Sequence, residues 1–296
     1  MSDLVYRGIL RDADVRFVYA VCTDLGNEAV CRHDLDPLSS HVLCRALGAG
    51  ALTIPLLNPD ERYTLRWNYA GAVKGVVVEA RGDGGMRGFI NPPNLYAYVQ
   101  QEEQLLGASG TVTVVKADQD HSLNTGTGQA GLLDVVEDLA FFFSTSDQVE
   151  TAMVVMVGFE PNPARPVSLC QGFMIQALPG CDLELFERLR HRLGSPVCRD
   201  LIAEQPRIDN HFERLVQALV GTETSAVFSV DAGPPPVFRC SCSHAHMCGL
   251  LATLGREELQ AAVDAGETLK LTCHFCSSRY EITPEQVRQA LAELDS

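Results

Sequence analysis

Short runs of β-prone residues separated by turn residues dominate the first half of the chain. Residues 72–81 (AVKGVVVEAR) and 86–90 (MRGFI) flank the turn sequence GDGG, a pattern typical of a β-hairpin. Residues 64–69, 110–115 and 151–159 are further strand candidates.

Two helices are expected in the same region. Asp36 and Pro37 open a stretch with helical spacing that runs to Leu47, and residues 132–143 form another. Hairpins combined with separate helices, rather than alternating βαβ units, favour an α+β fold of mixed sheet and helix for residues 1–182.

The pattern becomes helical after the sequence LPG at residues 178–180. From residue 183 to about 222, apolar residues recur every three or four positions. Pro196 and Pro206 divide this stretch into short helices. Because isolated helices of this length are marginally stable in water, we expect them to dock on the sheet of the first domain. The apolar stripe that would make this contact comprises Phe186, Leu189, Leu193, Phe212, Leu215 and Leu219.

The sequence GPPP at residues 233–236 indicates a stiff linker before a compact last segment. The elements expected there are a helix at residues 256–264, strands at 268–272 and 279–282, and a final helix that Thr283 caps, with Pro284 at its first position. We therefore divide the chain into an N-terminal domain (1–182), a helical linker (183–237) and a small C-terminal domain (238–296).

Composition narrows the classes of function. Apolar residues make up 46% of the 296 residues, enough for one large domain and a smaller one. The formal charge of −15, without a dense run of Lys or Arg, argues against a nucleic-acid partner. No apolar run approaches the roughly 18 residues that a membrane span needs, and the sequence MSDLVYRGIL lacks the pattern of a secretory signal. We therefore expect a cytoplasmic protein with no membrane contact.

Four of the eleven cysteines have the spacing of a metal site. Cys240 and Cys242 form a C-x-C pair, and Cys273 and Cys276 form a C-x-x-C pair thirty residues further on. Four thiolates in a tetrahedron are a preferred ligand set for zinc and leave no open position for catalysis. The sequence therefore predicts one Zn²⁺ per chain, which would also help a segment of about 60 residues to fold.

Other potential ligands lie close to the first pair. His244, His246 and Cys248 follow within nine residues of Cys240, so an exchange of ligands is conceivable. His274 is expected to face solvent. The seven cysteines outside the metal pattern are mostly isolated among apolar residues and are interpreted as small buried side chains: Cys22, Cys31, Cys44, Cys170, Cys181, Cys198 and Cys248.

The cysteine chemistry is compatible with a permanent zinc staple and with a redox switch. Zinc-bound thiolates are nucleophilic and can be oxidised, and a neighbouring thiol can convert the resulting sulfenic acid to a disulfide. Loss of the metal would remove folding free energy on the order of 10 kcal/mol from the segment.

The residues around these cysteines resemble heat shock protein 33, a family of redox-regulated holdase chaperones. The most specific matches are FRCSCS at 238–243, LGREEL at 254–259 and CHFC at 273–276. Upstream, the chain is similar to the family at MRGFINP (86–92), EDLA (137–140), SDQ (146–148) and GFMIQALPG (172–180). The resemblance covers nearly the whole chain. One departure follows the first cysteine pair, where the family usually has arginine and glutamate and this chain has His244, Ala245 and His246.

The resemblance implies a client-binding and dimerisation domain, a metastable helical linker and a zinc redox-switch domain. It implies an ATP-independent chaperone, not an enzyme, that is inactive while reduced and zinc-bound. Oxidation would form the disulfides Cys240–Cys242 and Cys273–Cys276, release zinc and unfold the linker. The exposed apolar surface would then hold unfolded or partly folded client proteins, with the chaperone as a homodimer, and protect cells against oxidative stress.

Two interpretations from other functional classes remain open. One is a constitutive zinc-ribbon module that binds a partner, although the acidic charge of the last segment argues against nucleic acid. The other is a thiol oxidoreductase, which would usually place its C-x-x-C at a helix N-terminus rather than between strands.

Overall fold

The computed structural model describes residues 2–119, 121–204, 211–224 and 227–293. The chain forms two compact units, Met1–Arg239 and Cys240–Ser296. No helix among the described residues is long and apolar enough to cross a membrane.

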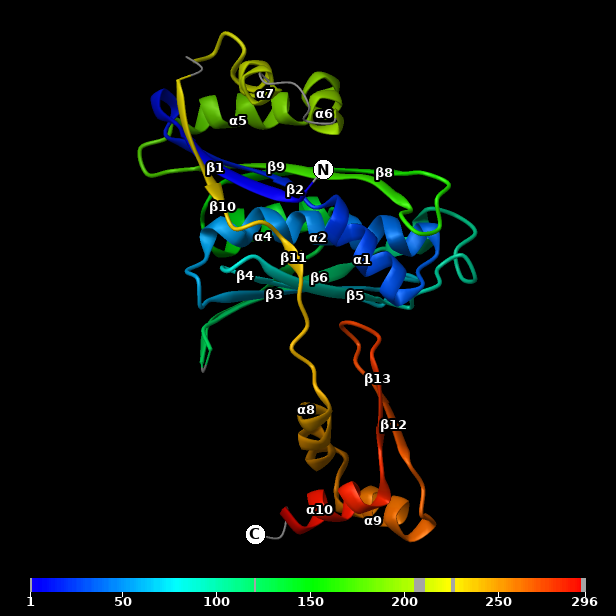
Figure 1. Ribbon diagram of the computed structural model, residues 1–296. Coiled ribbons are helices and arrows are strands. Elements are labelled where there is room, and N and C mark those ends of the chain that lie inside the picture. Colours follow the sequence, from blue (N-terminus) through cyan, green and yellow to red (C-terminus); the bar gives the residue numbers. More distant parts are fainter. Residues whose placement is uncertain (1, 120, 205–210, 225–226, 294–296) are drawn as a thin grey trace. The chain divides into compact units, whose positions relative to one another are not determined.

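The first unit contains two β-sheets (Figure 1). One has five antiparallel strands in the order β10 (Phe228–Gly233), β1 (Leu4–Leu10), β2 (Val15–Val21), β9 (Val167–Ala177) and β8 (Thr151–Phe159). The other has six strands in the order β11 (Val237–Phe238), β5 (Gly85–Asn91), β4 (Gly75–Arg81), β3 (Arg62–Tyr69), β6 (Gly110–Ala117) and β7 (Ser122–Gln129). Within the second sheet, β11 runs parallel to β5 and the other pairs are antiparallel. The predicted α+β class is confirmed.

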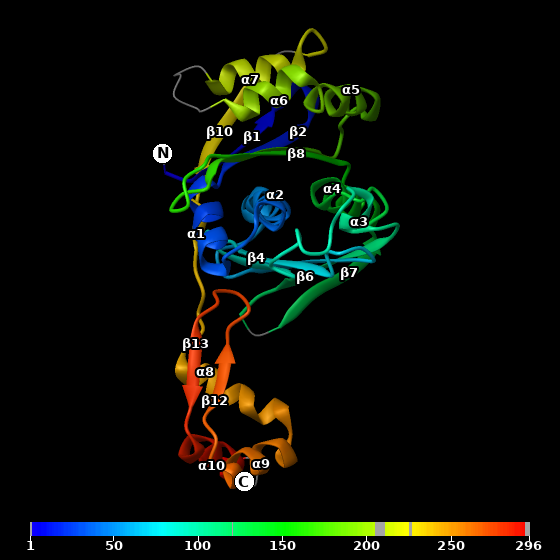
Figure 2. The same ribbon diagram turned by 90° about the vertical axis from the view of Figure 1, so that its right-hand side faces the viewer.

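A layer of helices separates the two sheets (Figure 2). It consists of α1 (Thr23–His33), α2 (Pro37–Thr53) and α4 (Val135–Ser146), whereas α3 (Glu103–Leu106) is a single turn. The side chain of Asp36 caps α2 by accepting a hydrogen bond from the Ser39 amide, and Asp134 caps α4 in the same way. The helix layer and the inner faces of both sheets share one large apolar core.

The predicted elements of this unit lie close to the observed ones. The predicted hairpin corresponds to β4 and β5, and the strands predicted at 64–69, 110–115 and 151–159 correspond to β3, β6 and β8. The helix predicted from Asp36 continues six residues beyond Leu47, to Thr53. The helix predicted from Leu132 begins three residues later, because Leu133 has a positive φ and Asp134 is the N-cap.

The outer face of the five-stranded sheet carries the helices of the predicted linker. These are α5 (Leu183–Leu193), α6 (Pro196–Ala203) and α7 (His211–Val220); Pro206 lies outside the described residues. They pack on β2, β8 and β9 through a second apolar core. Five residues of the predicted stripe are at most 1% exposed, namely Phe186, Leu189, Leu193, Leu215 and Leu219, and Phe212 is half-buried against the same core.

The strand β2 shows why the two cores are separate. Phe17 and Tyr19 point to the core under α5–α7, whereas Val18 and Ala20 point to the core around α2. Both faces of the sheet are therefore covered, and β2 has no polar face.

The second unit is small. It contains α8 (His244–Gly249), α9 (Arg256–Ala265), β12 (Leu269–Thr272), β13 (Arg279–Ile282) and α10 (Pro284–Glu293), with a turn of 3₁₀ helix at Leu250–Leu254. Strands β12 and β13 form an antiparallel hairpin. At the start of α10 the Thr283 amide donates to the Gln286 side chain at 2.9 Å, which is one of the two hydrogen bonds of a capping box. The apolar core of this unit has five buried members among the described residues: Leu251, Leu259, Ile282, Val287 and Leu291.

Candidate metal centre

The turn of the β12–β13 hairpin holds two of the cysteines. Cys273 and Cys276 are both buried. The Cys273 amide donates to the Ser278 carbonyl at 2.9 Å, and the Ser277 amide donates to the Cys273 carbonyl at 2.8 Å. Ser277 closes the turn with φ of 57°. These bonds make a tight loop that directs both sulfurs to the same side.

Cys240 and Cys242 approach this turn from the start of the second unit. The Sγ atoms of Cys240 and Cys273 are 3.8 Å apart, and those of Cys242 and Cys276 are 3.2 Å apart. All four Sγ atoms lie within 4.8 Å of one another. The structure thus brings together the four cysteines that the sequence singles out.

These separations suit a single four-coordinate ion. Zn–S bonds of about 2.3 Å in a tetrahedron place the sulfurs about 3.8 Å apart. The donor set consists of four soft sulfurs, which zinc prefers and which magnesium or calcium would not select. The cluster can therefore hold a metal ion whose coordination shell is complete without water or substrate.

The protein environment treats the four thiols unequally in the metal-free state. Burial raises the pKa of Cys242 to about 12. Burial also acts to raise the pKa of Cys276, but hydrogen bonds from Ser278 outweigh it and lower this pKa to about 7. Cys276 is therefore more acidic than Cys242, and a bound metal ion would favour the thiolate form of all four cysteines.

Two polar side chains around the cluster have no counterpart in the sequence prediction. The Tyr280 hydroxyl donates to Cys242 Sγ at 3.1 Å, and the Ser278 hydroxyl lies 3.2 Å from Cys276 Sγ. Both follow the C-x-x-C pair at alternate positions, 278 and 280, so they share a face of the hairpin with the sulfurs. The spacing of these two polar residues directly after the C-x-x-C pair was the available signal, because hydrogen-bonding side chains around a metal site orient its ligands.

The extra candidate ligands are not part of the cluster. Among the described residues, the group that can hold a metal comprises the four cysteines without His244, His246 or Cys248. The His244 ring lies between Cys248, at 3.5 Å from its sulfur, and the Glu281 carbonyl, at 3.1 Å. The structure thus gives His244 a structural role at the edge of β13.

Most of the remaining cysteines are buried, as expected, but two expectations need correction. Cys31 is exposed, because it faces outward on α1. Cys22 and Cys170 are not isolated from each other, since their sulfurs are 3.3 Å apart, with Cys22 directly after β2 and Cys170 on β9. Both are fully buried, and the hydrogen bond to Cys170, together with burial, raises the pKa of Cys22 well above its ordinary value. A protonated, buried thiol is a poor nucleophile, so we assign this pair no reactive role.

A family model described as Hsp33 protein matches residues 3–283 of the chain. The chain belongs to the Hsp33 family. The 33 kDa chaperonin of Symbiobacterium thermophilum is 31% identical over 294 residues, covering 98% of this chain and 97% of that protein. The 33 kDa chaperonin of Clostridium perfringens is 30% identical over 304 residues, covering 99% of this chain and 92% of that protein.

A solved structure has the same fold. The crystal structure of the 33 kDa chaperonin of Thermotoga maritima, a heat shock protein 33 homologue, superposes with a TM-score of 0.80 over the full length of both chains, at 23% sequence identity. The predicted resemblance to the Hsp33 family is confirmed, and membership supports a chaperone function, which implies the binding of client proteins.

Proposed function

We propose that this protein is an ATP-independent holdase whose activity is controlled by the redox state of a zinc centre. The observation that carries the proposal is the cluster of four sulfurs within 4.8 Å, in a unit whose apolar core is small, in a chain of a chaperone family. In the reduced state Cys240, Cys242, Cys273 and Cys276 would bind one Zn²⁺ and complete the fold of Cys240–Ser296.

Oxidation acts on the thiolates. Peroxide oxidises one thiolate to a sulfenic acid and is itself reduced to hydroxide; a second thiolate then attacks the sulfenic sulfur, forming a disulfide and expelling a second hydroxide. Two peroxide molecules thus convert four thiolates to two disulfides. We propose the pairs Cys240–Cys242 and Cys273–Cys276. A cluster without thiolates has no remaining donors for zinc, so the unit loses much of its folding free energy.

The helices α5–α7 are the element that we propose to respond. They cover the apolar outer face of the five-stranded sheet, and the described part of the chain between α7 and the cluster contains the short strands β10 and β11. If the second unit unfolds, undocking of these helices would expose a large apolar surface, which can hold unfolded or partly folded clients. We propose that the oxidised form is a homodimer, that residues 183–237 act as a metastable linker, and that the protein works in the cytoplasm, where thiols are kept reduced until stress.

One experiment tests the switch and separates it from a constitutive zinc module. Zinc content and the suppression of aggregation of a heat-unfolded client are measured on one sample, before and after peroxide with mild heating. The switch predicts one zinc per reduced chain, zinc loss on oxidation, and holdase activity only after oxidation. Equal activity before and after oxidation, with zinc retained, would contradict it.

A further inference from the structure

Tyr280 places its hydroxyl on one sulfur of the metal centre. The hydroxyl donates to Cys242 Sγ at 3.1 Å, across 38 positions of the chain. The Tyr280 ring packs against the small apolar core of the second unit, on β13 and opposite Leu271 of β12. An aromatic side chain with an apolar body and a polar tip can fill a core and still reach a polar partner. The contact with Cys242 is therefore built into the hairpin.

A second contact restrains the Tyr280 ring. The rings of His244 and Tyr280 meet edge to face, with their centroids 6.4 Å apart. His244 is itself tied to β13, because its Nε2 atom lies 3.1 Å from the carbonyl oxygen of Glu281. Helix α8 and strand β13 together therefore hold the hydroxyl against Cys242, and the contact lasts only while both elements are folded.

The sulfurs of the C-x-x-C pair receive backbone hydrogen bonds instead. The amide and the hydroxyl of Ser278 both bond to Cys276. The amides of Phe275 and Cys276 bond to Cys273. Backbone donors of this kind belong to the turn, so no side-chain substitution removes them. The bond to Cys242 comes from a side-chain hydroxyl, and a single substitution can therefore remove it.

A hydrogen bond to a thiolate sulfur changes its reaction with peroxide. The thiolate attacks with an electron pair on sulfur: an S–O bond forms, the O–O bond breaks, and hydroxide leaves. The negative charge moves from the sulfur to the departing oxygen during this step. A donor aimed at the sulfur therefore stabilises the thiolate more than the transition state, and it slows the attack.

We propose that Tyr280 lowers the reactivity of Cys242 towards peroxide and so sets the oxidant level at which the metal centre opens. While α8 and β13 are folded, the hydroxyl stays on the sulfur and the thiolate reacts slowly. Conditions that loosen either element remove the hydroxyl and leave a more nucleophilic sulfur. The inference deepens the proposed function and rests on it, since it concerns the oxidation of the same four cysteines.

Tyr280→Phe tests this role, because it keeps the ring in the core and removes the hydroxyl. The reduced, zinc-loaded full chain is mixed with hydrogen peroxide and a chromogenic zinc chelator, and the rate of zinc release is recorded. We expect release about tenfold faster than in wild type, since a hydrogen bond to a charged group is worth roughly that factor. Zinc release to the chelator without peroxide should match wild type. Tyr98→Phe is the control, because it removes the hydroxyl of an exposed tyrosine in the first unit, and it should match wild type in both measurements.

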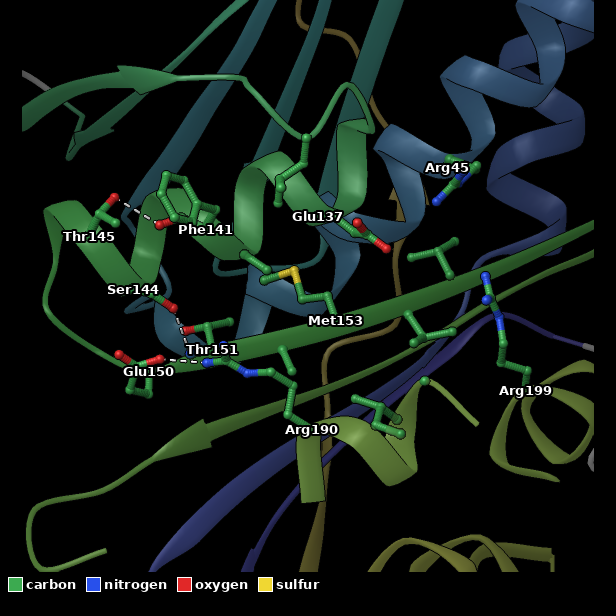
Figure 3. A pocket seen from close by; sticks show the side chains of 17 residues that line it. Arg45, Glu137, Phe141, Ser144, Thr145, Glu150, Thr151, Met153, Arg190 and Arg199 are labelled. Carbon is green, nitrogen blue, oxygen red and sulfur yellow. Dashed lines mark hydrogen bonds and ion pairs between the residues drawn. The ribbon is translucent and has the colours of Figure 1, made fainter. Parts of the chain in front are cut away.

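A reagent that traps sulfenic acids, followed by peptide mapping, shows which sulfur reacts. The share of label on Cys242 should rise in Tyr280→Phe. It should not rise in Ser278→Ala, which removes a hydroxyl from Cys276 instead. Peroxide also oxidises thioethers, and Met153 lines a cavity between α4 and the helices α5 and α6 (Figure 3). A cyclic 1,3-diketone reacts with sulfenic acids and not with methionine sulfoxide, so oxidation in that cavity adds no label.

Three results would overturn the proposal. The first is equal peroxide-driven zinc release from Tyr280→Phe and wild type. The second is a variant that loses zinc faster by the same factor to the chelator alone, because the hydroxyl would then hold the fold and leave the reactivity of the sulfur unchanged. The third is an unchanged share of label on Cys242. None of these results bears on the redox switch, which the zinc content and the holdase activity of the wild-type protein test separately.

Discussion

Phe212 of α7 packs against Phe17 of β2, with ring centroids 5.4 Å apart. Phe17 also lies 5.7 Å from Phe173 of β9 and 6.1 Å from Phe228 of β10, between ring centroids. One aromatic cluster therefore joins the last linker helix, the centre of the sheet and the strand that leads towards the second unit. Release of α7 would expose this aromatic cluster to solvent. The docking of α5–α7 on the sheet is therefore the contact that a mutation should weaken to test the proposed activation.

We expect Leu189→Glu to activate the chaperone without oxidation. Leu189 is fully buried between α5 and the sheet. Its replacement removes about 1.5–3 kcal/mol of burial free energy and places a charge in an apolar contact, which costs more. Undocking of the helices should increase binding of a hydrophobic dye and suppress client aggregation under reducing conditions. Both are measured with zinc content and free thiols checked on the same sample.

Leu183→Glu is the matched control, because Leu183 begins the same helix but is 60% exposed. It should leave dye binding and aggregation unchanged. A Leu189→Glu protein that stays folded, keeps its zinc and shows no holdase activity would refute release of the linker as the activating step.

The sequence predicts elements best where one face of a strand or helix meets solvent. In β3 the residues Tyr63, Leu65 and Trp67 are buried and alternate with more exposed neighbours, and the strand is recognisable. In β2 and β9 both faces are covered, so the alternation disappears and neither strand was predicted. The helix α1 was not predicted for a different reason. Its N-cap residue, Cys22, makes no side-chain capping bond, and the first amides of the helix donate instead to the side chain of Asp3, which is distant in the sequence. No residue next to the helix therefore marks its start.

The candidate site shows the same division. The four cysteines could be predicted because the spacing typical of a metal site is visible within each pair, C-x-C and C-x-x-C. The prediction then needs only that the fold brings the two pairs together. The contacts of Tyr280 and His244 could not, since they depend on the register of β12 and β13 and on where α8 lies.

Removal of one sulfur should weaken metal binding sharply. Four thiolates contribute on the order of 10 kcal/mol or more to a structural zinc site, so loss of one should cost about 3 kcal/mol, roughly a hundredfold in affinity. We expect this for Cys273→Ser, measured by competition with a chromogenic chelator under reducing conditions. Cys248→Ser is the control, because Cys248 lies outside the cluster of sulfurs, and it should keep one zinc per chain. Full zinc retention by Cys273→Ser would refute the ligand assignment.

The buried carboxyl of Asp3 should make the first unit less stable as the pH rises. Burial raises the pKa of Asp3 from 3.8 to about 6, against the lowering effect of the amides of Asp24 and Leu25. The folded state therefore binds this proton more tightly than the unfolded chain. The stabilisation is fully present below about pH 4 and is lost as the pH rises through about 6, on the order of 3 kcal/mol in total, of which about 2 kcal/mol is lost between pH 4.5 and 7.

Asp3→Asn should remove this part of the pH dependence. Urea unfolding is followed between pH 4.5 and 7 by the fluorescence of Trp67, the single tryptophan, which is buried in the first unit. The difference in unfolding free energy between wild type and variant should change by this amount across the interval. Asp60→Asn is the control, because it removes a carboxylate from an exposed turn. The unfolding free energy of this variant should depend on pH in the same way as that of wild type. If the unfolding free energy of Asp3→Asn also follows the wild-type pH dependence, the pKa of Asp3 does not change on folding and the prediction is wrong.

The order of oxidation and unfolding should decide which disulfides form. In the folded cluster the Sγ atoms of Cys242 and Cys276 are 3.2 Å apart, so proximity alone favours a bridge between the two motifs. Once the unit unfolds, the two cysteines of each motif remain within three residues of each other, whereas the motifs are separated by a long loop whose closure costs entropy. We therefore expect Cys240–Cys242 and Cys273–Cys276 after peroxide with mild heating, as measured by peptide mapping without reduction.

Oxidation in the cold supplies the comparison, because the fold then persists while the first disulfide forms. A larger share of the Cys242–Cys276 bridge is expected under those conditions, together with lower holdase activity, since that bridge ties the second unit together instead of releasing it. A product dominated by bridges between the motifs at the activating temperature, or by bridges through Cys248, would contradict the local pairing and with it the unfolding of Cys240–Ser296 as the trigger.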